Sequence, residues 1–182
     1  MQKATEAARR VIPKSVRRAT LDYALATWGN VFIVIWRRNT TAAAVQDLHL
    51  QCKRFGAIHP EGVLLLTIIR EGAPAPDGST RSALASFLKS ADYIRGSAVI
   101  MEGTSFRAAF VRGVVTGLTM LAHQPFPHQV CSMEAAGQLF ASAVAGTPLP
   151  FELESFQRGI SELRATIEKD LADPSAKVGN VA

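Results

Sequence analysis

The sequence predicts an α/β domain, in which a mainly parallel sheet opens with an antiparallel β-hairpin and carries helices packed on it. Two apolar runs flank Gly29 and Asn30, and such a two-residue connection suits a tight hairpin because both residues tolerate positive φ. After the hairpin, apolar segments of strand length alternate with segments of helical periodicity. This alternation is typical of parallel strands joined by right-handed crossovers.

The expected strands are short apolar stretches that each end in a turn or a polar segment. The run 62–69 is continuously apolar and β-branched, which is typical of a strand covered on both faces. The five expected strands are 20–28, 31–36, 62–69, 96–101 and 128–133.

Helices are expected in the segments between these strands. Asn39, Thr40 or Thr41 can cap the first, and Gly56 ends it. The others are expected over 81–91, 105–122 and 134–144. In the segment 105–122, Gly113 and Gly117 lie on or beside the apolar face, where they would let the helix approach its neighbour closely.

The basic charge is concentrated at the start of the chain. Residues 1–18 carry six basic side chains and one acidic side chain. Their net charge of +5 is the same as that of the whole chain. We interpret 1–18 as a solvated arm before an α/β domain at 19–146. The alternative is that this arm contacts nucleic acid, an anionic membrane or an acidic partner.

Residues 147–172 are expected to form a C-terminal amphipathic helix, followed by a flexible tail at 173–182. Its apolar residues recur at steps of three or four, as in a helix with a narrow seam. They are Leu153, Phe156, Ile160, Leu163, Ile167 and Leu171. The favoured interpretation is that this seam docks on its own domain. The alternative is a homodimer or another protein contact through Phe156, Ile160 and Leu163.

Composition narrows the class of protein. No run approaches eighteen consecutive apolar residues, so we expect no transmembrane segment. The first residues contain no uninterrupted apolar stretch of the kind found in signal peptides. Cys52 and Cys131 are too few for a disulfide framework. These features favour a cytoplasmic globular protein.

The order of elements resembles that of STAS domains, the anti-sigma-factor-antagonist fold, over about residues 20–145. The resemblance consists of the opening hairpin, the crossover "RNTTAAAVQDL" and three further strand–helix units. STAS phosphorylation switches carry Asp-Ser-Ser/Thr-Gly where the third strand meets the second helix. Asp77, Ser79 and Thr80 are the counterparts here, in a longer loop with the glycine ahead of the hydroxyls. The resemblance implies regulation or the binding of lipids or other small molecules.

Polar residues follow the expected strands and should share one edge of the sheet, where ligands of open parallel sheets bind. Free amides at the starts of helices attract anions there. The candidates for a ligand or phosphorylation site are Asn39, Asp77, Ser79, Thr80, Thr104 and Ser105. The alternative for these residues is helix capping alone. Arg107 and Arg112 are candidate partner contacts, since they lie off the packed stripe of their helix.

Metal and catalytic sites are weakly indicated. His49 with Cys52, and His128 with Cys131, share a His-x-x-Cys spacing that zinc sites use. Residues three apart on a strand face opposite ways, so we expect no metal site and no cofactor. Glu71 and Glu102 end neighbouring strands and are the only acid–base pair that we consider.

We therefore expect a non-catalytic regulatory domain that binds a protein partner. Phosphorylation or an anionic ligand at the carboxyl edge of the sheet would switch it. The alternative is a small-molecule or lipid carrier with an apolar pocket beneath that edge. An enzyme that uses Glu71 and Glu102 is the least favoured alternative.

Overall fold

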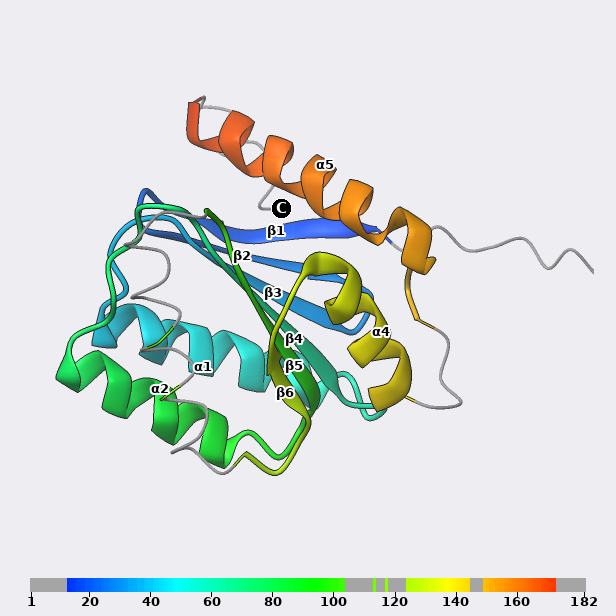
Figure 1. Cartoon of the computed structure of the whole chain (residues 1–182), viewed down its shortest axis with the longest axis horizontal. Coiled ribbons are helices and arrows are strands. Elements are labelled where there is room, and N and C mark those ends of the chain that lie inside the picture. The colour runs from blue at the N-terminus through cyan, green and yellow to red at the C-terminus, as the bar shows by residue number, and fades with distance from the viewer. Residues whose placement is uncertain (1–12, 104–112, 114–116, 118–123, 145–148, 173–182) are drawn as a thin grey trace, which may run out of the picture.

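The computed structural model describes residues 13–103, 113, 117, 124–144 and 149–172. Within them, a six-stranded sheet lies between two pairs of helices (Figure 1). The strands are β1 (Lys14–Ala19), β2 (Tyr23–Trp28), β3 (Val31–Trp36), β4 (Val63–Ile69), β5 (Ile94–Met101) and β6 (His128–Val130). The helices are α1 (Ala42–Ala57), α2 (Gly78–Ser90), α4 (Met133–Ala143) and α5 (Leu153–Ala172).

The strands lie in the sheet in the order in which they occur along the chain. β1, β2 and β3 are antiparallel, whereas β3 to β6 are parallel. Trp28 pairs with Val31 across the two-residue turn, and Gly29 has φ 55°. The predicted hairpin and the predicted parallel sheet are therefore confirmed. One consequence is that β3, β4 and β5 all end at the same edge.

β1 differs from the prediction, because the sheet begins inside the segment interpreted as a basic arm. Its ladder with β2 is interrupted between Val16 and Arg18, where the register shifts. Strand β1 is an edge strand, and edge strands commonly carry charged residues that hide the apolar alternation. Lys14 forms an ion pair with Glu162 of α5, and its ammonium group lies 4.9 Å from the centre of the Trp28 ring.

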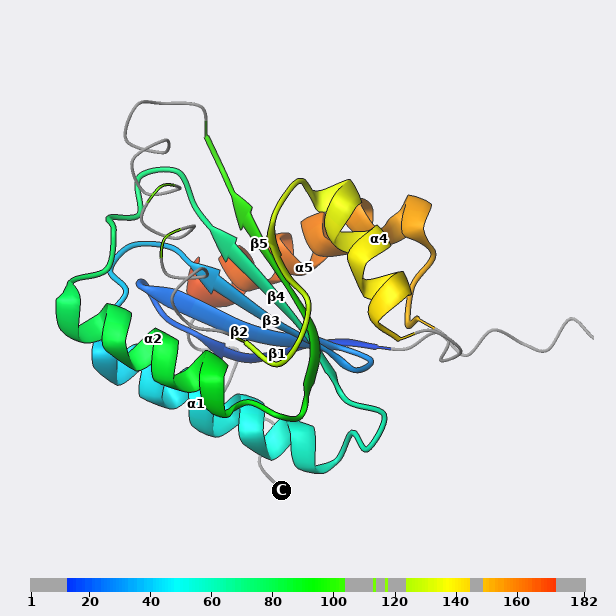
Figure 2. The same cartoon turned by 60° about the horizontal axis from the view of Figure 1, so that its bottom comes forward.

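Alternation along the strands gives the sheet two buried faces. In β4, Leu64, Leu66 and Ile68 face α4 and α5, whereas Val63 and Leu65 face α1 and α2. Figure 2 shows the two helix pairs on opposite faces of the twisted sheet. Because both faces are covered, the central strands β3 and β4 are apolar at every position except Thr67.

Helices α1, α2 and α4 begin at side-chain caps. Thr41 caps α1 and accepts a hydrogen bond from the amide of Ala44 at 3.2 Å. Of the helix expected over 105–122, only Gly113 and Gly117 are described, and both are helical. Among the other described residues, no heavy atom outside this helix lies within 4 Å of a Cβ built at either glycine. The close approach expected at these glycines is therefore not found in the described residues.

Helix α5 docks on the α4 side of the sheet, as the favoured interpretation of its seam predicted. Phe156, Ile160 and Leu163 are each at most 2% exposed in the core that α4 and α5 share with the sheet. These three side chains are not available to a partner in this arrangement, which corrects their selection as contact residues. No described helix combines the length and the apolarity that crossing a membrane requires.

Substituting Gly159 tests the docking of α5. A Cβ at this position would lie 2.2 Å from Cη2 of the buried Trp28 ring. We expect Gly159→Ala to lower the free energy of unfolding by about 1–3 kcal/mol, because the ring has to move. The matched control is Gly113→Ala, in which the free energy of unfolding should rise by about 0.8–1.0 kcal/mol. Urea denaturation measures both; equal stabilisation of both variants would contradict the docking.

Candidate functional site

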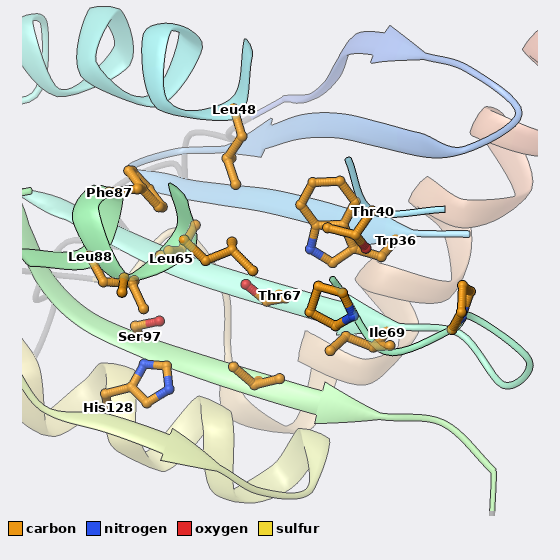
Figure 3. A pocket seen from close by; sticks show the side chains of 15 residues that line it. Trp36, Thr40, Leu48, Leu65, Thr67, Ile69, Phe87, Leu88, Ser97 and His128 are labelled. Carbon is orange, nitrogen blue, oxygen red and sulfur yellow. The ribbon is translucent and has the colours of Figure 1, made fainter. Parts of the chain in front are cut away.

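A cavity of about 80 Å³ lies between the sheet and the helices α1 and α2 (Figure 3). Its floor is formed by strand residues: Trp36, Leu65, Thr67, Ile69, Ser97, Val99 and His128. Its walls come from the helices and the segments that lead into them: Thr40, Leu48, Pro74, Pro76, Leu84, Ala85, Phe87 and Leu88. The cavity extends from His128 at the start of β6 and Ser97 in the middle of β5 to Trp36 and Ile69, the last residues of β3 and β4.

The register of the parallel strands brings the polar floor residues together. Ser97 of β5 pairs with His128 of β6, and on its other side with Leu65 of β4. Thr67 lies two residues beyond Leu65, and side chains two apart on a strand point to the same face. Figure 3 shows Ser97 beside His128, with Thr67 further along the floor.

Ser97 is the most deeply buried polar residue of the cavity. Its exposure is 0%, and its hydroxyl has no hydrogen-bond partner among the described residues. A buried hydroxyl without a partner costs about 1–3 kcal/mol relative to one that is paired. The great majority of buried polar side-chain atoms in proteins have a partner, so this one requires an explanation.

His128 presents a second unpaired group. Both ring nitrogens are buried and have no partner among the described residues. Burial lowers the pKa of the imidazole from 6.5 to about 4, because an apolar environment disfavours the charged form. At neutral pH the ring is therefore uncharged, and it offers one N–H donor and one acceptor.

Apart from Thr40 and Thr67, the remainder of the described lining of the cavity is apolar, and it is uncharged. No Lys, Arg, Asp or Glu is among the described residues that line it. The loop between β4 and α2 contributes Pro74 and Pro76, and Gly72 has φ 88°, a conformation that glycine adopts without strain. Small-molecule sites commonly combine an apolar lining with a few convergent polar groups, and at about 80 Å³ this cavity is smaller than the usual volume of such sites, about 300–1,000 Å³.

Three charged residues at the carboxyl edge, Arg37, Arg70 and Glu102, form ion pairs with α5. Glu168 accepts hydrogen bonds from Nη2 of Arg37 at 2.8 Å and from Nη1 of Arg70 at 3.1 Å. The hydrogen bond from Arg37 is the main cause that lowers the pKa of Glu168. Arg164 binds both carboxylate oxygens of Glu102. The anion-binding capacity expected at this edge is thus met in part by carboxylates of the protein itself.

Asp77, Ser79 and Thr80 lie together at the start of α2. The residue that caps this helix is Asp77, and neither Ser79 nor Thr80 is its cap. The Asp77 carboxylate accepts from the amide of Thr80 at 2.7 Å and from the hydroxyl of Ser79 at 2.8 Å. These bonds, the amide first, lower the pKa of Asp77 to about 2. Ser79 is exposed, whereas Thr80 is 1% exposed and turned into the protein.

The other predicted site residues either lie away from the cavity or fall outside the described residues. Asn39 lies after β3 as expected, and its amide nitrogen donates to Asp22 at 3.3 Å, so it belongs to a turn contact rather than to the cavity. Four candidates lie outside the described residues: Thr104, Ser105, Arg107 and Arg112. Of the proposed acid pair, Glu102 is bound by Arg164, and Glu71 lies beside Gly103.

The two His-x-x-Cys segments do not converge in the described part of the chain, where no three His, Cys, Asp or Glu residues come together. The His49 ring lies 5.4 Å from that of Phe87, and burial raises the pKa of the Cys52 thiol to about 12. His128 faces the cavity, whereas Cys131 packs against the core on the other side of the sheet.

Sequence reasoning missed the polar floor of the cavity. The available signal was a polar residue at a buried position of a largely apolar strand: Thr67 in β4 and Ser97 in β5. The sequence pattern indicated His128 only as a metal-ligand candidate. Their adjacency depends on the pairing of β4, β5 and β6, which the sequence pattern does not specify.

The burial of His128 predicts a pH-dependent stability. The unfolded imidazole titrates near pH 6.5 and the folded one near pH 4, so only the unfolded state gains the proton between these values. We expect the free energy of unfolding of the wild type to fall by about 2–3 kcal/mol from pH 7 to pH 4, relative to His128→Gln. Urea denaturation across this range, with pH 8 as the baseline, measures the difference. Parallel curves would show that the ring is not buried.

The chain matches no protein-family model, no curated protein and no solved structure. The chemistry of the cavity residues is therefore the basis on which a function can be assigned.

Proposed function

We propose that this domain binds a small, mainly apolar molecule in the cavity between the sheet and α1 and α2. The observation that carries the proposal is the unpaired hydroxyl of Ser97 at the floor of a largely apolar hollow. Alanine would fill the same position without the cost of burying a hydroxyl. Retaining serine there is understandable if a bound molecule supplies the missing partner.

The position of the cavity supports the same function. In open α/β sheets, ligands bind at the carboxyl ends of the strands. Trp36 and Ile69, the last residues of β3 and β4, line the cavity together with Pro74 and Pro76 of the following loop. A molecule bound there would contact two central strands and the loop that leads to α2.

A STAS-like relationship is compatible with this proposal. The hairpin β2–β3, the crossover α1 and the succession of β4, α2 and β5 follow the order of elements on which the resemblance was based. Related domains bind lipids or small molecules, or act as regulatory modules. We propose a binding role rather than a catalytic one, because the Glu102 carboxylate is already bound by Arg164.

Filling the cavity tests the proposal. Leu84 is half-buried and lines the cavity, so Leu84→Trp should occupy the space of a ligand. We expect the wild type to bind toluene and Leu84→Trp to bind it at least about tenfold more weakly. NMR of the Leu, Ile and Val methyl groups of the protein measures this binding. Native mass spectrometry of the purified wild type should also detect a co-purified small molecule.

The matched control is Leu50→Trp, the same change at an α1 residue that is 47% exposed and does not line the cavity. It should bind toluene as the wild type does. Equal weakening in both variants would indicate a general effect on folding. A wild type that carries no co-purified molecule and binds neither toluene nor its polar analogue phenol would overturn the proposal.

A regulatory interaction domain switched at Ser79 is the second candidate function. Ser79 is exposed, and its hydroxyl donates to Asp77, the residue that caps α2. A phosphate on Ser79 would bring a second negative group against the Asp77 carboxylate and would compete with it for the free amides of the helix. The start of α2 would therefore change its structure and its charge together.

Site-specific incorporation of phosphoserine at position 79 tests this switch in the full chain. We expect faster hydrogen exchange of the first-turn amides of α2, because the Asp77 cap is displaced. Phosphoserine at Ser161, an exposed position on α5, is the control and should leave α2 unchanged. Unaltered exchange in α2 with phosphoserine at 79 would exclude a switch that acts through this helix. The same proteins serve as baits for partners that depend on the phosphate.

A further inference from the structure

We infer that the ligand of the cavity is an uncharged molecule with an apolar body and one hydroxyl or amide group, which hydrogen-bonds to Ser97 and His128. This inference rests on the proposed function and names the chemical class of the ligand. It follows from three features of the cavity: the position of its unpaired polar groups, the absence of charge from its described lining, and its largely apolar walls.

Among the described residues that line the cavity, the buried polar atoms without a partner belong to Ser97 and His128, which lie next to each other. Ser97 and His128 are directly paired neighbours on β5 and β6, and both side chains point to the α2 side of the sheet (Figure 3). Paired residues on neighbouring strands have side chains close enough to contact one ligand atom or one ligand group. One polar group of a ligand can therefore satisfy both residues, and the rest of the molecule extends along Thr67 and the apolar floor.

The chemistry of the two residues specifies a group that both donates and accepts. The serine hydroxyl has one hydrogen to donate and two lone pairs, and a neutral imidazole has one N–H and one lone pair. A hydroxyl group can accept from one of these residues and donate to the other. A primary or secondary amide can do the same with its oxygen and its N–H. A hydrocarbon leaves both residues unpaired.

The lining disfavours a charged ligand. No cationic or anionic side chain is among the described lining residues, and burial keeps the imidazole neutral at pH 7. A carboxylate or an ammonium group placed there would lose its hydration without gaining a counter-charge. The arginines at the edge, Arg37 and Arg70, are bound to Glu168 instead.

Three probes of similar shape test the inference: phenol, toluene and benzoate. Binding is followed at pH 7.5 by NMR of the methyl groups and of the ¹⁵N-labelled imidazoles. We expect phenol to bind and to shift the ring-nitrogen resonances of His128, which report hydrogen bonding, whereas toluene should bind without that shift. Benzoate should bind at least about tenfold more weakly than phenol.

The variant Ser97→Ala removes one oxygen atom. It distinguishes a ligand that hydrogen-bonds to Ser97 from one that binds through apolar contacts alone. We expect the substitution to weaken the binding of phenol by about tenfold, which corresponds to about 1.4 kcal/mol, and to leave the binding of toluene no weaker. Ser86→Ala, at an exposed α2 serine outside the cavity, is the matched control and should change neither affinity. Since Ser97→Ala removes an unpaired buried hydroxyl, it should fold as stably as the wild type or more so.

The outcomes distinguish this inference from the proposed function. If toluene binds but Ser97→Ala leaves phenol unaffected and phenol leaves the His128 resonances unmoved, the inference is wrong and the cavity remains an apolar site. If benzoate binds as tightly as phenol, the ligand class is not restricted to neutral molecules and the inference is again wrong. If neither phenol nor toluene binds the wild type, the proposed function fails and the inference fails with it.

Discussion

The burial of the central sheet on both faces is the constraint on which the rest of the structure depends. β3 and β4 are apolar along almost their whole length, so each face needs a cover. Helices α1 and α2 cover one face, and α4 and α5 cover the other. Parallel pairing from β3 onward then brings the ends of these strands, and the cavity beneath them, to one edge.

Local signals explain how much of the fold could be predicted from the sequence. Gly29 and Asn30 identify the hairpin because few residues tolerate the backbone of such a turn. Thr41 marks the start of α1 because its side chain replaces a missing backbone acceptor. β1 was missed because Arg17 and Arg18 give an edge strand the composition of a solvated arm.

The candidate site was predictable only in part, because its polar residues come from different strands. The edge at which ligands would gather followed from the parallel topology, and the cavity lies beneath it. The pairing of Ser97 with His128 joins residues far apart in the chain and depends on the register of β5 and β6. Asp77 was grouped with the correct loop, but its capping role depends on the conformation of the backbone around it.

The bridge from Glu168 to Arg37 and Arg70 has a consequence for the order in which the molecule is completed. Two guanidinium groups near each other repel, and a carboxylate between them removes that repulsion. This carboxylate belongs to α5, which a ribosome synthesises after every strand of the sheet. The ion pairs of Arg37 and Arg70 with Glu168 can therefore form only after α5 has been synthesised, and the same helix contributes Phe156 to the hydrophobic layer around Trp28.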